Sequence, residues 1–400
     1  MILDPKMKFQ EVIGQDAVKH NLIGLVKGNR LSHALLFLAR EGSGGLPLAL
    51  ALSQYLVCEK VNSNATPSLF GDPEPLELPD EACGECSACH KAADMVHPDI
   101  HFSYPVVPRK PGDKPLSTDY ITEWREFARL YPYGNVYDWL QFIGAENKQG
   151  NITAAECQEI IRKLNLKSFE SVYKILVMWM PEYLGNEGNK LLKLIEEPPA
   201  NTLFILVAQE ESKILPTIQS RTQLVKIPAL ENREIARALV ERAGASEDAA
   251  HQAASVSDGN YREALQTLQH AESDWEETIR TWLNAALRTG PAEQVRWTNE
   301  VSGLGREKQK QMLRYFNHLL EQSIRLRILG RENLHSPSNE IDFAERINKL
   351  ATLSQQQAIV EELDRAVYHI ERNANAKMLF QALTIRIYHI IKDNALTIVN

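Results

Sequence analysis

His33-Ala-Leu-Leu-Phe-Leu38 is an apolar run that leads into the glycine-rich turn Glu41-Gly-Ser-Gly-Gly-Leu46. From Leu48 to Cys58 the apolar side chains then recur in a helical pattern. A strand, a glycine turn and a helix in this order are the setting of a phosphate-binding loop, where backbone N–H groups and the helix dipole hold an anion. The order therefore predicts an α/β domain and marks the turn as a candidate nucleotide site.

The first half of the chain contains further apolar runs of strand length, separated by helical patterns. These runs are Asp99 to Val107, Lys174 to Trp179, Leu203 to Ala208 and Leu224 to Ile227. Strands that are apolar along their whole length are typical of a parallel sheet covered by helices on both faces. We therefore expect a doubly wound α/β domain over residues 1–230.

Beyond residue 230 the patterns are helical only. Breaks at Ala243-Gly-Ala245 and Ser257-Asp-Gly259 divide residues 231–273 into three short helical stretches. Helical periodicity then continues over residues 274–400, interrupted by the polar stretch His335-Ser-Pro-Ser-Asn339. The sequence predicts a small three-helix element followed by an all-helical domain.

Composition points to a soluble protein with protein partners. Of the 400 residues, 44% are hydrophobic and 24% are charged, and the net charge of −8 argues against a surface that binds nucleic acid all over. No apolar run approaches about 18 residues, so a membrane span is not expected. The N-terminal stretch is too charged for a signal peptide, so we expect a cytoplasmic protein, in which cysteines are metal ligands or free thiols.

The glycine turn lacks two side chains that a working phosphate loop uses. Such a loop ends in Gly-Lys-Ser/Thr, whose ammonium group reaches the β- and γ-phosphates and whose hydroxyl binds magnesium. Gly42, Gly44 and Gly45 supply the backbone freedom, but Gly45 and Leu46 stand at the lysine and hydroxyl positions. The turn is therefore either an ordinary glycine-rich turn or a nucleotide site that has lost its chemistry.

The run Lys174 to Trp179 shows a second loss. A working ATPase of this type ends the corresponding strand in acidic residues that hold magnesium and polarise the attacking water. Trp179 and Met180 stand there instead, and neither offers the oxygen ligand that Mg²⁺ requires. Glu182 is nearby but out of register, and we interpret it as a solvated loop carboxylate. ATP hydrolysis by this chain is not expected.

Four cysteines form a candidate metal site. Cys83-Gly-Glu-Cys86-Ser-Ala-Cys89 places three thiols at three-residue spacing, and Cys58 can supply the fourth ligand. Four thiolates favour tetrahedral Zn²⁺, and such a closed site is structural because no position is open to water. An iron–sulfur cluster and a redox-active thiol pair are the alternatives. The spacing predicts a zinc module over about residues 58–97, with Cys157 a packed thiol outside it.

Five segments carry a family resemblance. The most specific is Asn189-Lys-Leu-Leu-Lys-Leu-Ile-Glu-Glu-Pro-Pro199, and the others are Phe9 to Gln15, Ser32 to Phe37, Leu215 to Arg221 and Tyr368 to Asn375. Together they resemble the AAA+ clamp-loader subunits of bacterial DNA polymerase III, which share an N-x-LLK-x-x-EEPP segment and a run ending in Ser-Arg-Cys. Active motor subunits of that family keep the lysine and the acidic pair, so the resemblance is to the delta-prime type.

This resemblance implies an AAA+ α/β domain with a zinc insert, a helical lid at 231–273 and a helical collar at 274–400 that joins subunits. It also implies that Arg221 is an arginine finger inserted into the ATP site of a neighbouring subunit, a role that suits a planar, permanently charged group. An ordinary surface arginine paired with a carboxylate is the alternative reading of Arg221. The chain departs from the family at Thr222, where the motif has cysteine, and in the insert Trp124 to Gln149.

Two residues that sense nucleotide in active relatives are expected to be structural here. Gln209 stands at the first-sensor position, and Arg262 lies in a segment that resembles the second-sensor helix. Without a lysine to bind triphosphate, neither has a nucleotide to sense, and we expect Arg262 to pair with a carboxylate of its own domain.

The function that the resemblance implies is a subunit that does not hydrolyse ATP and helps to load a sliding clamp onto primed DNA during DNA replication. The expected partners are the delta and gamma/tau subunits, with ATP bound by neighbouring subunits. The sliding clamp and primer-template DNA would be reached through the assembly, without a membrane. Two alternatives remain open: an active AAA+ ATPase with an unusual phosphate loop, and a zinc-dependent DNA-binding module.

Overall fold

The computed structural model describes residues 8–62, 78–110, 112–145, 148–269, 275–331, 338–371 and 374–395. The chain divides into two compact units, Met1–Leu265 and Gln266–Asn400. Within the described ranges, no helix is long and apolar enough to cross a membrane.

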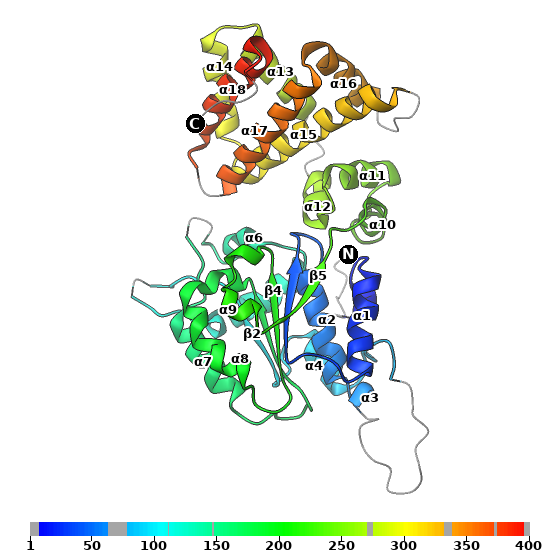
Figure 1. Ribbon diagram of the computed structural model, residues 1–400, viewed down its shortest axis with the longest axis vertical. Helices are drawn as coiled ribbons and strands as arrows, with labels where there is room; N and C mark the ends of the chain where they lie inside the picture. Colours follow the sequence, from blue (N-terminus) through cyan, green and yellow to red (C-terminus); the bar gives the residue numbers. More distant parts are fainter. Residues whose placement is uncertain are drawn as a thin grey trace, which may run out of the picture. The chain divides into compact units, whose positions relative to one another are not determined.

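A five-stranded sheet forms the centre of the first unit (Figure 1). Its order is β2-β3-β4-β1-β5, and every neighbouring pair is parallel. The strands are β1 (Ala34–Ala39), β2 (Ile100–Ser103), β3 (Lys174–Trp179), β4 (Thr202–Ala208) and β5 (Gln223–Ile227). In the central strands the register pairs Leu36 of β1 with Leu206 of β4 and Leu224 of β5. The predicted parallel sheet is therefore confirmed.

The strand β2 is shorter than the predicted run of residues 99–107. The backbone N–H of Tyr104 donates to Ser117 Oγ at 3.1 Å instead of continuing the ladder. Pro105 then follows and has no N–H to offer a neighbouring strand. The chain returns only for an isolated antiparallel bridge between Val106 and Asn151.

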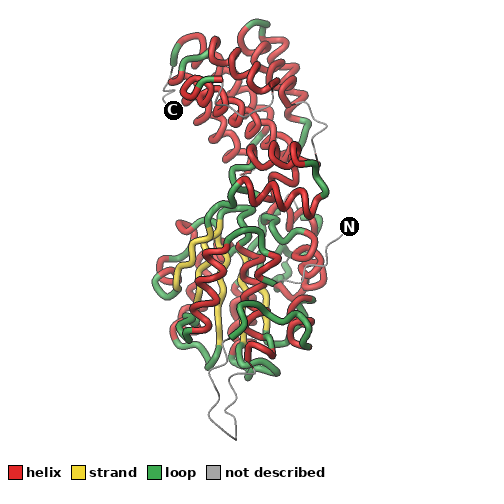
Figure 2. Tube along the Cα trace, turned by 90° about the vertical axis from the view of Figure 1, so that its right-hand side faces the viewer, coloured by secondary structure: helices red, strands yellow, loops and turns green. Residues whose placement is uncertain are grey.

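Helices cover both faces of the sheet because successive strand side chains point to opposite faces. Leu35 and Phe37 of β1 belong to one apolar core and Leu36 to the other. The first core is covered by α1 (Asp16–Lys27), α2 (Gly45–Val57), α4 (Ser87–Ala93), α5 (Ile121–Leu130) and α6 (Val136–Phe142). The second is covered by α7 (Ala154–Leu164), η4 (Pro181–Leu191), α8 (Leu192–Glu196) and α9 (Pro216–Gln219). Figure 2 shows helices in front of the strands when the view is turned by 90°.

The insert that the family pattern does not explain forms α5 and α6 and carries an aromatic cluster. The ring of Trp124 stacks on Tyr104, with centroids 4.0 Å apart and planes 11° apart. Trp139 meets Trp124 edge-on at 5.5 Å, and Trp179 at the end of β3 lies 5.2 Å from Trp124. Offset and edge-to-face contacts of this kind add to the free energy gained from burial. The insert therefore packs over the end of β3.

Three helices follow β5: α10 (Asn232–Ala243), α11 (Glu247–Val256) and α12 (Tyr261–Gln269). Gly244, with φ of +68°, ends α10 in the left-handed conformation that glycine adopts without strain. Ser246 begins α11, and its hydroxyl accepts the N–H of Ala249 at 3.4 Å. The three helices that the sequence predicted are therefore present, and most of them belong to the first unit.

The second unit is helical throughout its described residues. Its helices are α13 (Trp275–Leu287), α14 (Pro291–Ser302), α15 (Arg306–Leu329), α16 (Ser338–Leu350), α17 (Leu353–Glu371) and α18 (Ala376–Asp393). Trp282 stacks on Trp297 at 4.6 Å, and its indole N–H donates to Thr384 Oγ1 at 2.8 Å. A separate apolar core holds these helices together, as the predicted all-helical domain requires.

Truncating the central ring of the aromatic cluster tests its weight in the fold. The Trp124→Ala substitution should lower the free energy of unfolding by about 3–5 kcal/mol, because it leaves a large cavity among rings. Trp124 Nε1 has no hydrogen-bond partner in the described structure, so the loss reflects packing alone. Chemical denaturation measures it. Phe169→Ala is the control, because Phe169 is 82% exposed, and it should change stability by less than about 0.5 kcal/mol. Equal values for the two variants would contradict the packing account.

Candidate nucleotide-binding and metal sites

The glycine turn lies between β1 and α2, where a phosphate loop belongs. Gly42 and Gly44 adopt φ values of +68° and +100°, which glycine reaches without strain. Gly45 begins α2, and a methyl group added there would lie 2.6 Å from the Cβ of Ala39. Leu46 is buried and joins the core beside the sheet. The loop therefore has the predicted backbone form, and the two positions that matter for catalysis carry no ammonium group and no hydroxyl.

Side chains from distant parts of the chain cover this loop. A methyl group added at Gly42 would lie 1.8 Å from Asn260 Oδ1, and one at Gly44 would lie 3.2 Å from Tyr133 Cε1. The carbonyl of Gly42 accepts the N–H of Tyr261 at 3.2 Å. The hydroxyl of Tyr133 accepts the N–H of Ile13 at 2.8 Å. Both glycines are therefore closely packed against side chains from the insert and from the start of α12.

The end of β3 is apolar, as the sequence indicated. Trp179 and Met180 are both buried, and Trp179 faces the aromatic cluster of α5 and α6. Neither supplies an oxygen for a metal ion. Packed rings therefore surround the end of β3.

Glu182 is not the solvated loop carboxylate that we expected. Its Oε1 accepts the backbone N–H of Glu210 at 2.9 Å and that of Gln209, and its Oε2 is buried. Burial raises the pKa of Glu182, while the two backbone bonds act in the opposite direction. The carboxylate ties the end of β3 to the end of β4 and thereby engages Gln209, the residue at the first-sensor position.

Arg262 is found in the pairing that we expected of it. Its Nη2 donates to Asp138 Oδ1 at 2.6 Å, its Nε bonds to Asp138 Oδ2, and its Nη1 lies 3.4 Å from Glu41 Oε1. Two carboxylates, one on α6 and one in the glycine turn, therefore bind the guanidinium.

Arg221 lies between α9 and β5, at the amino-terminal edge of the sheet. Gln223, two residues on, pairs with Leu35 near the start of β1, whereas the glycine turn follows the other end of β1. Four residue steps of strand, or roughly 13 Å, separate these two edges. Arg221 Nε donates to Glu196 Oε1 at 2.6 Å, and its Nη1 donates to Thr217 O at 2.8 Å. The carboxylate pairing that was the alternative reading is thus present in the isolated chain.

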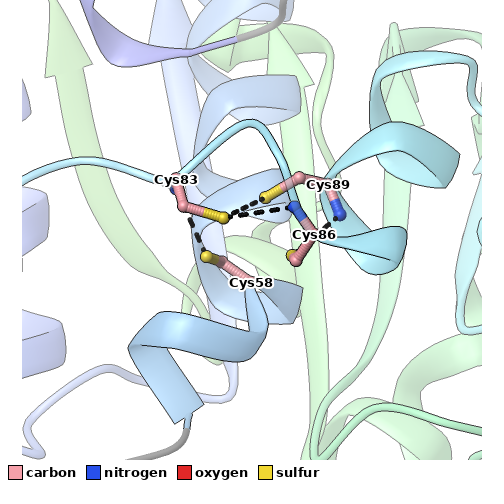
Figure 3. Close-up of side chains that lie close together, drawn as sticks. All are labelled: Cys58, Cys83, Cys86 and Cys89. Atoms are coloured by element: carbon pink, nitrogen blue, oxygen red, sulfur yellow. Dashed lines mark hydrogen bonds between the residues drawn. The ribbon is translucent and has the colours of Figure 1, made fainter.

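The four cysteines predicted as metal ligands come together between α2 and α4 (Figure 3). The sulfur atoms of Cys58, Cys83, Cys86 and Cys89 all lie within 4.8 Å of one another, and those of Cys83 and Cys89 are 3.8 Å apart. Backbone N–H groups point at the sulfurs: Cys83 N to Cys58 Sγ, Cys86 N to Cys83 Sγ and Cys89 N to Cys86 Sγ, each at 3.4 Å. Gly84, with φ of +73°, allows the tight turn. Such N–H···S bonds favour the thiolate form that binds metal.

The surroundings hold this cysteine cluster in place. Lys8 Nζ donates to Cys83 O, and Gln54 Nε2 donates to Cys89 O, both at 3.1 Å. A hydrogen bond from the Cys89 thiol lowers the pKa of Cys58, and the same bond raises the pKa of Cys89. Cys157 lies in the core on the other face of the sheet, where burial raises its pKa to about 11. The cluster could bind a metal ion, and Cys157 has no part in it.

A profile of the family described as DNA polymerase III, delta subunit, matches residues 14–231, more than half of the 400 residues. The chain belongs to this family. The match spans the glycine turn, the cysteine cluster and the whole sheet, so the family assignment rests on the part of the molecule described above.

Relatives with delta-prime names support the predicted subunit type. DNA polymerase III subunit delta' of Bacillus subtilis is 26% identical over 228 residues, which are 57% of this chain and 52% of that protein. Subunit delta' of Escherichia coli is 24% identical over 380 residues, 93% of each chain. Subunit tau of Bacillus subtilis is 24% identical over 321 residues, 79% of this chain and 46% of that one. The chain thus spans about half the length of the two Bacillus subtilis proteins, and the predicted resemblance to delta-prime subunits is confirmed.

The sequence did not reveal the residues that cover the glycine turn. Tyr133 and Asn260 reach it from the loop before α6 and from the residue before α12, and Asp138 of α6 binds Arg262, which faces Glu41 of the turn. The sequence around Asn135 and Asp138 has the pattern of a helix N-terminal cap. That pattern predicts the start of a helix and not a contact with Arg262. Contacts between residues so far apart in the chain produce no pattern in the sequence from which they could be predicted.

The contact between the glycine turn and Asn260 can be tested with two glycines of equal conformation. Gly42→Ala combines backbone strain at φ of +68° with a clash against Asn260, whereas Gly144→Ala, at φ of +67°, meets nothing within 4 Å. Strain alone should cost Gly144→Ala about 1–2 kcal/mol of unfolding free energy, and Gly42→Ala should cost about 1–3 kcal/mol more. Thermal or chemical denaturation gives both values. Equal losses would show that the loop is not covered.

Proposed function

We propose that this chain is a delta-prime type subunit of a clamp-loading assembly, which helps to load a sliding clamp onto primed DNA and does not itself hydrolyse ATP. The observation that carries the proposal is the chemistry of one sheet edge. Gly45, Leu46, Trp179 and Met180 stand where lysine, hydroxyl and acidic groups are required. All four are buried, and the ring of Trp179 packs against Trp124 and Phe127. Without these groups, an α/β domain can keep its shape but cannot polarise a phosphoanhydride.

Arg221 would act outside its own chain. It lies at the sheet edge opposite to the glycine turn, too far away to act on a ligand bound at the turn of its own chain. A role at the ATP of a neighbouring subunit is therefore favoured. The guanidinium fork would bind the γ-phosphate as negative charge redistributes in the transition state. ATP would be bound and hydrolysed by the neighbour and not by this chain.

The ion pair with Glu196 is compatible with this role. The side chains of Arg221 and Glu196 are 34% and 45% exposed, and a pair at that level of exposure contributes only about 0–1 kcal/mol. A neighbour's triphosphate, with its magnesium ion, offers a stronger anion than one solvated carboxylate. Glu196 would therefore keep Arg221 extended along the surface until the neighbour docks.

The partners would be the delta and gamma/tau subunits. Subunit tau of Bacillus subtilis is itself a relative of this chain, so subunits of one fold could stand side by side around a ring. We propose three parts for this arrangement: residues 1–230 as the α/β domain, 231–273 as the lid and 274–400 as the collar that joins subunits. The clamp and primer-template DNA would be reached through that assembly.

The cysteine cluster would hold a structural zinc ion through Cys58, Cys83, Cys86 and Cys89. Four thiolates complete a tetrahedral shell and leave no position for a reacting water. The ion would fasten the start of α4 to the end of α2, a junction from which the chain runs on to β2. The ion would stabilise the folded state of this segment, because four thiolates bind one metal ion only when the segment is folded.

The arginine role predicts a specific kinetic defect. In the reconstituted assembly, Arg221→Ala should slow ATP turnover by roughly tenfold or more, because removal of an arginine finger withdraws charge stabilisation from the transition state. Arg162→Ala is the matched control, since Arg162 is also an exposed arginine paired with a carboxylate, Glu159. Turnover with Arg162→Ala should equal that of the wild type. An Arg221→Ala assembly that turns over ATP at the wild-type rate would exclude the finger.

The zinc assignment predicts which cysteine matters. Metal analysis of the purified chain should find stoichiometric zinc in the wild type and in Cys157→Ser, and little or none in Cys89→Ser. Loss of one thiolate opens the shell, and structural Zn²⁺ sites support the fold directly. Cys89→Ser should therefore also unfold earlier than Cys157→Ser on heating. Iron in place of zinc, with visible absorbance, would identify the iron–sulfur alternative.

A further inference from the structure

The lid contains a buried arginine that is satisfied from within the chain. The side chain of Arg262 is 5% exposed, and those of its partners Asp138 and Glu41 are 18% and 23% exposed. Two nitrogen atoms of the guanidinium engage both oxygens of Asp138, and a third faces Glu41. A guanidinium at this depth requires an anion, because an unpaired buried charge is strongly destabilising.

We propose that Asp138 is a built-in anion that holds the lid on the α/β domain in place of a bound nucleotide. The inference rests on the proposed function, in which this chain does not hydrolyse ATP. It goes further by naming Asp138 as the residue that keeps the lid closed without a ligand. Asp138 is a positioning residue in this account and takes no part in a reaction.

Asp138 is fixed before it meets Arg262. It is the third residue of α6, and its Oδ2 accepts the backbone N–H of Asn135 at 3.0 Å. Asn135 Oδ1 in turn accepts the N–H of Asp138 at 3.0 Å. A carboxylate in the first turn of a helix is also favoured by the helix dipole. The insert thus presents a preorganised carboxylate to the lid.

Aromatic and backbone contacts close the same junction around this ion pair. The rings of Tyr133 and Tyr261 meet at 68° with centroids 5.0 Å apart. The N–H of Tyr261 is bonded to the carbonyl of Gly42, and Arg242 of the lid donates to Glu11 O at 2.7 Å. Residues from the N-terminal segment, the glycine turn, the insert and the lid therefore interlock without a ligand.

A ligand can shift a conformational equilibrium only as far as it binds one state better than the other. Here a phosphate that bound the guanidinium of Arg262 would first have to displace Asp138, which already holds it through two bonds. The lid should accordingly stay closed with the same stability whether or not nucleotide is present. If the Arg262–Asp138 ion pair only added to overall stability, its loss would not speed hydrogen exchange in the lid alone. The exchange rates of the lid amides distinguish the two cases.

Hydrogen exchange of the full-length chain, followed by mass spectrometry, tests the inference. In Asp138→Asn, which keeps an oxygen for the Asn135 N–H but loses the charge, amides of α10, α11 and residues 261–265 should exchange roughly tenfold faster or more. The wild type should exchange at one rate with and without magnesium ATP. Glu159→Gln is the matched control, because Glu159 also holds an arginine through two bonds, at 2.7 and 2.8 Å, but on α7 at the surface. Its lid should exchange like that of the wild type.

Two results would overturn the inference: slower lid exchange of the wild type in magnesium ATP, or unchanged lid exchange in Asp138→Asn. Should Asp138→Asn fail to fold, Arg262→Lys replaces it, since lysine keeps the charge but loses the two-pronged contact. Its lid should then exchange faster than that of the wild type, and an unchanged rate would again overturn the inference. The turnover of Arg221→Ala assemblies tests the proposed function separately, because Arg221 bonds to Glu196, Thr217 and Ser220 at the opposite sheet edge.

Discussion

The carboxyl ends of β1, β3 and β4 meet at one edge of the sheet because all three strands are parallel and adjacent. Whatever residues follow these strands must face the same space, which in α/β folds is where ligands bind. In this chain the residues are glycines, a buried leucine, a tryptophan and a carboxylate already bonded to backbone N–H groups. The parallel sheet thus brings these residues to one edge, where they are buried or already hydrogen-bonded.

The packed rings at this edge also avoid an electrostatic problem. Acidic residues clustered at such an edge repel one another unless a cation is bound, and each is costly to bury. Trp179 among the rings of Trp124 and Phe127 needs no counter-ion. A domain that binds ligand gains stability only while the ligand is present, whereas packed rings contribute at all times. The rings of α5 therefore stabilise the end of β3 through packing alone.

What the sequence could predict depended on whether the signal was local. The sequence predicted the five strands and the cysteine cluster because neighbouring residues determine each of them. Apolar runs mark the strands, and thiols at three-residue spacing mark the cluster. The sequence did not predict that Glu182 is buried and hydrogen-bonded. Its partners are the backbone N–H groups of Gln209 and Glu210, which β4 brings beside it. The covering of Gly42 by Asn260 joins residues more than two hundred positions apart, and no periodicity in the sequence encodes it.

Burial also separates the two arginines that family resemblance singled out. Arg262 is 5% exposed and bonded by both oxygens of Asp138, so releasing it would leave an unpaired charge inside the protein. Arg221 is 34% exposed, and its partner Glu196 lies at the surface, where water screens the attraction and either residue can separate at little cost. Solvent access thus distinguishes the two guanidinium groups: Arg262 is held inside this chain, whereas Arg221 is accessible at the surface. Glu196 and Arg221 belong to separate recognisable segments, and their ion pair brings these segments together at the surface.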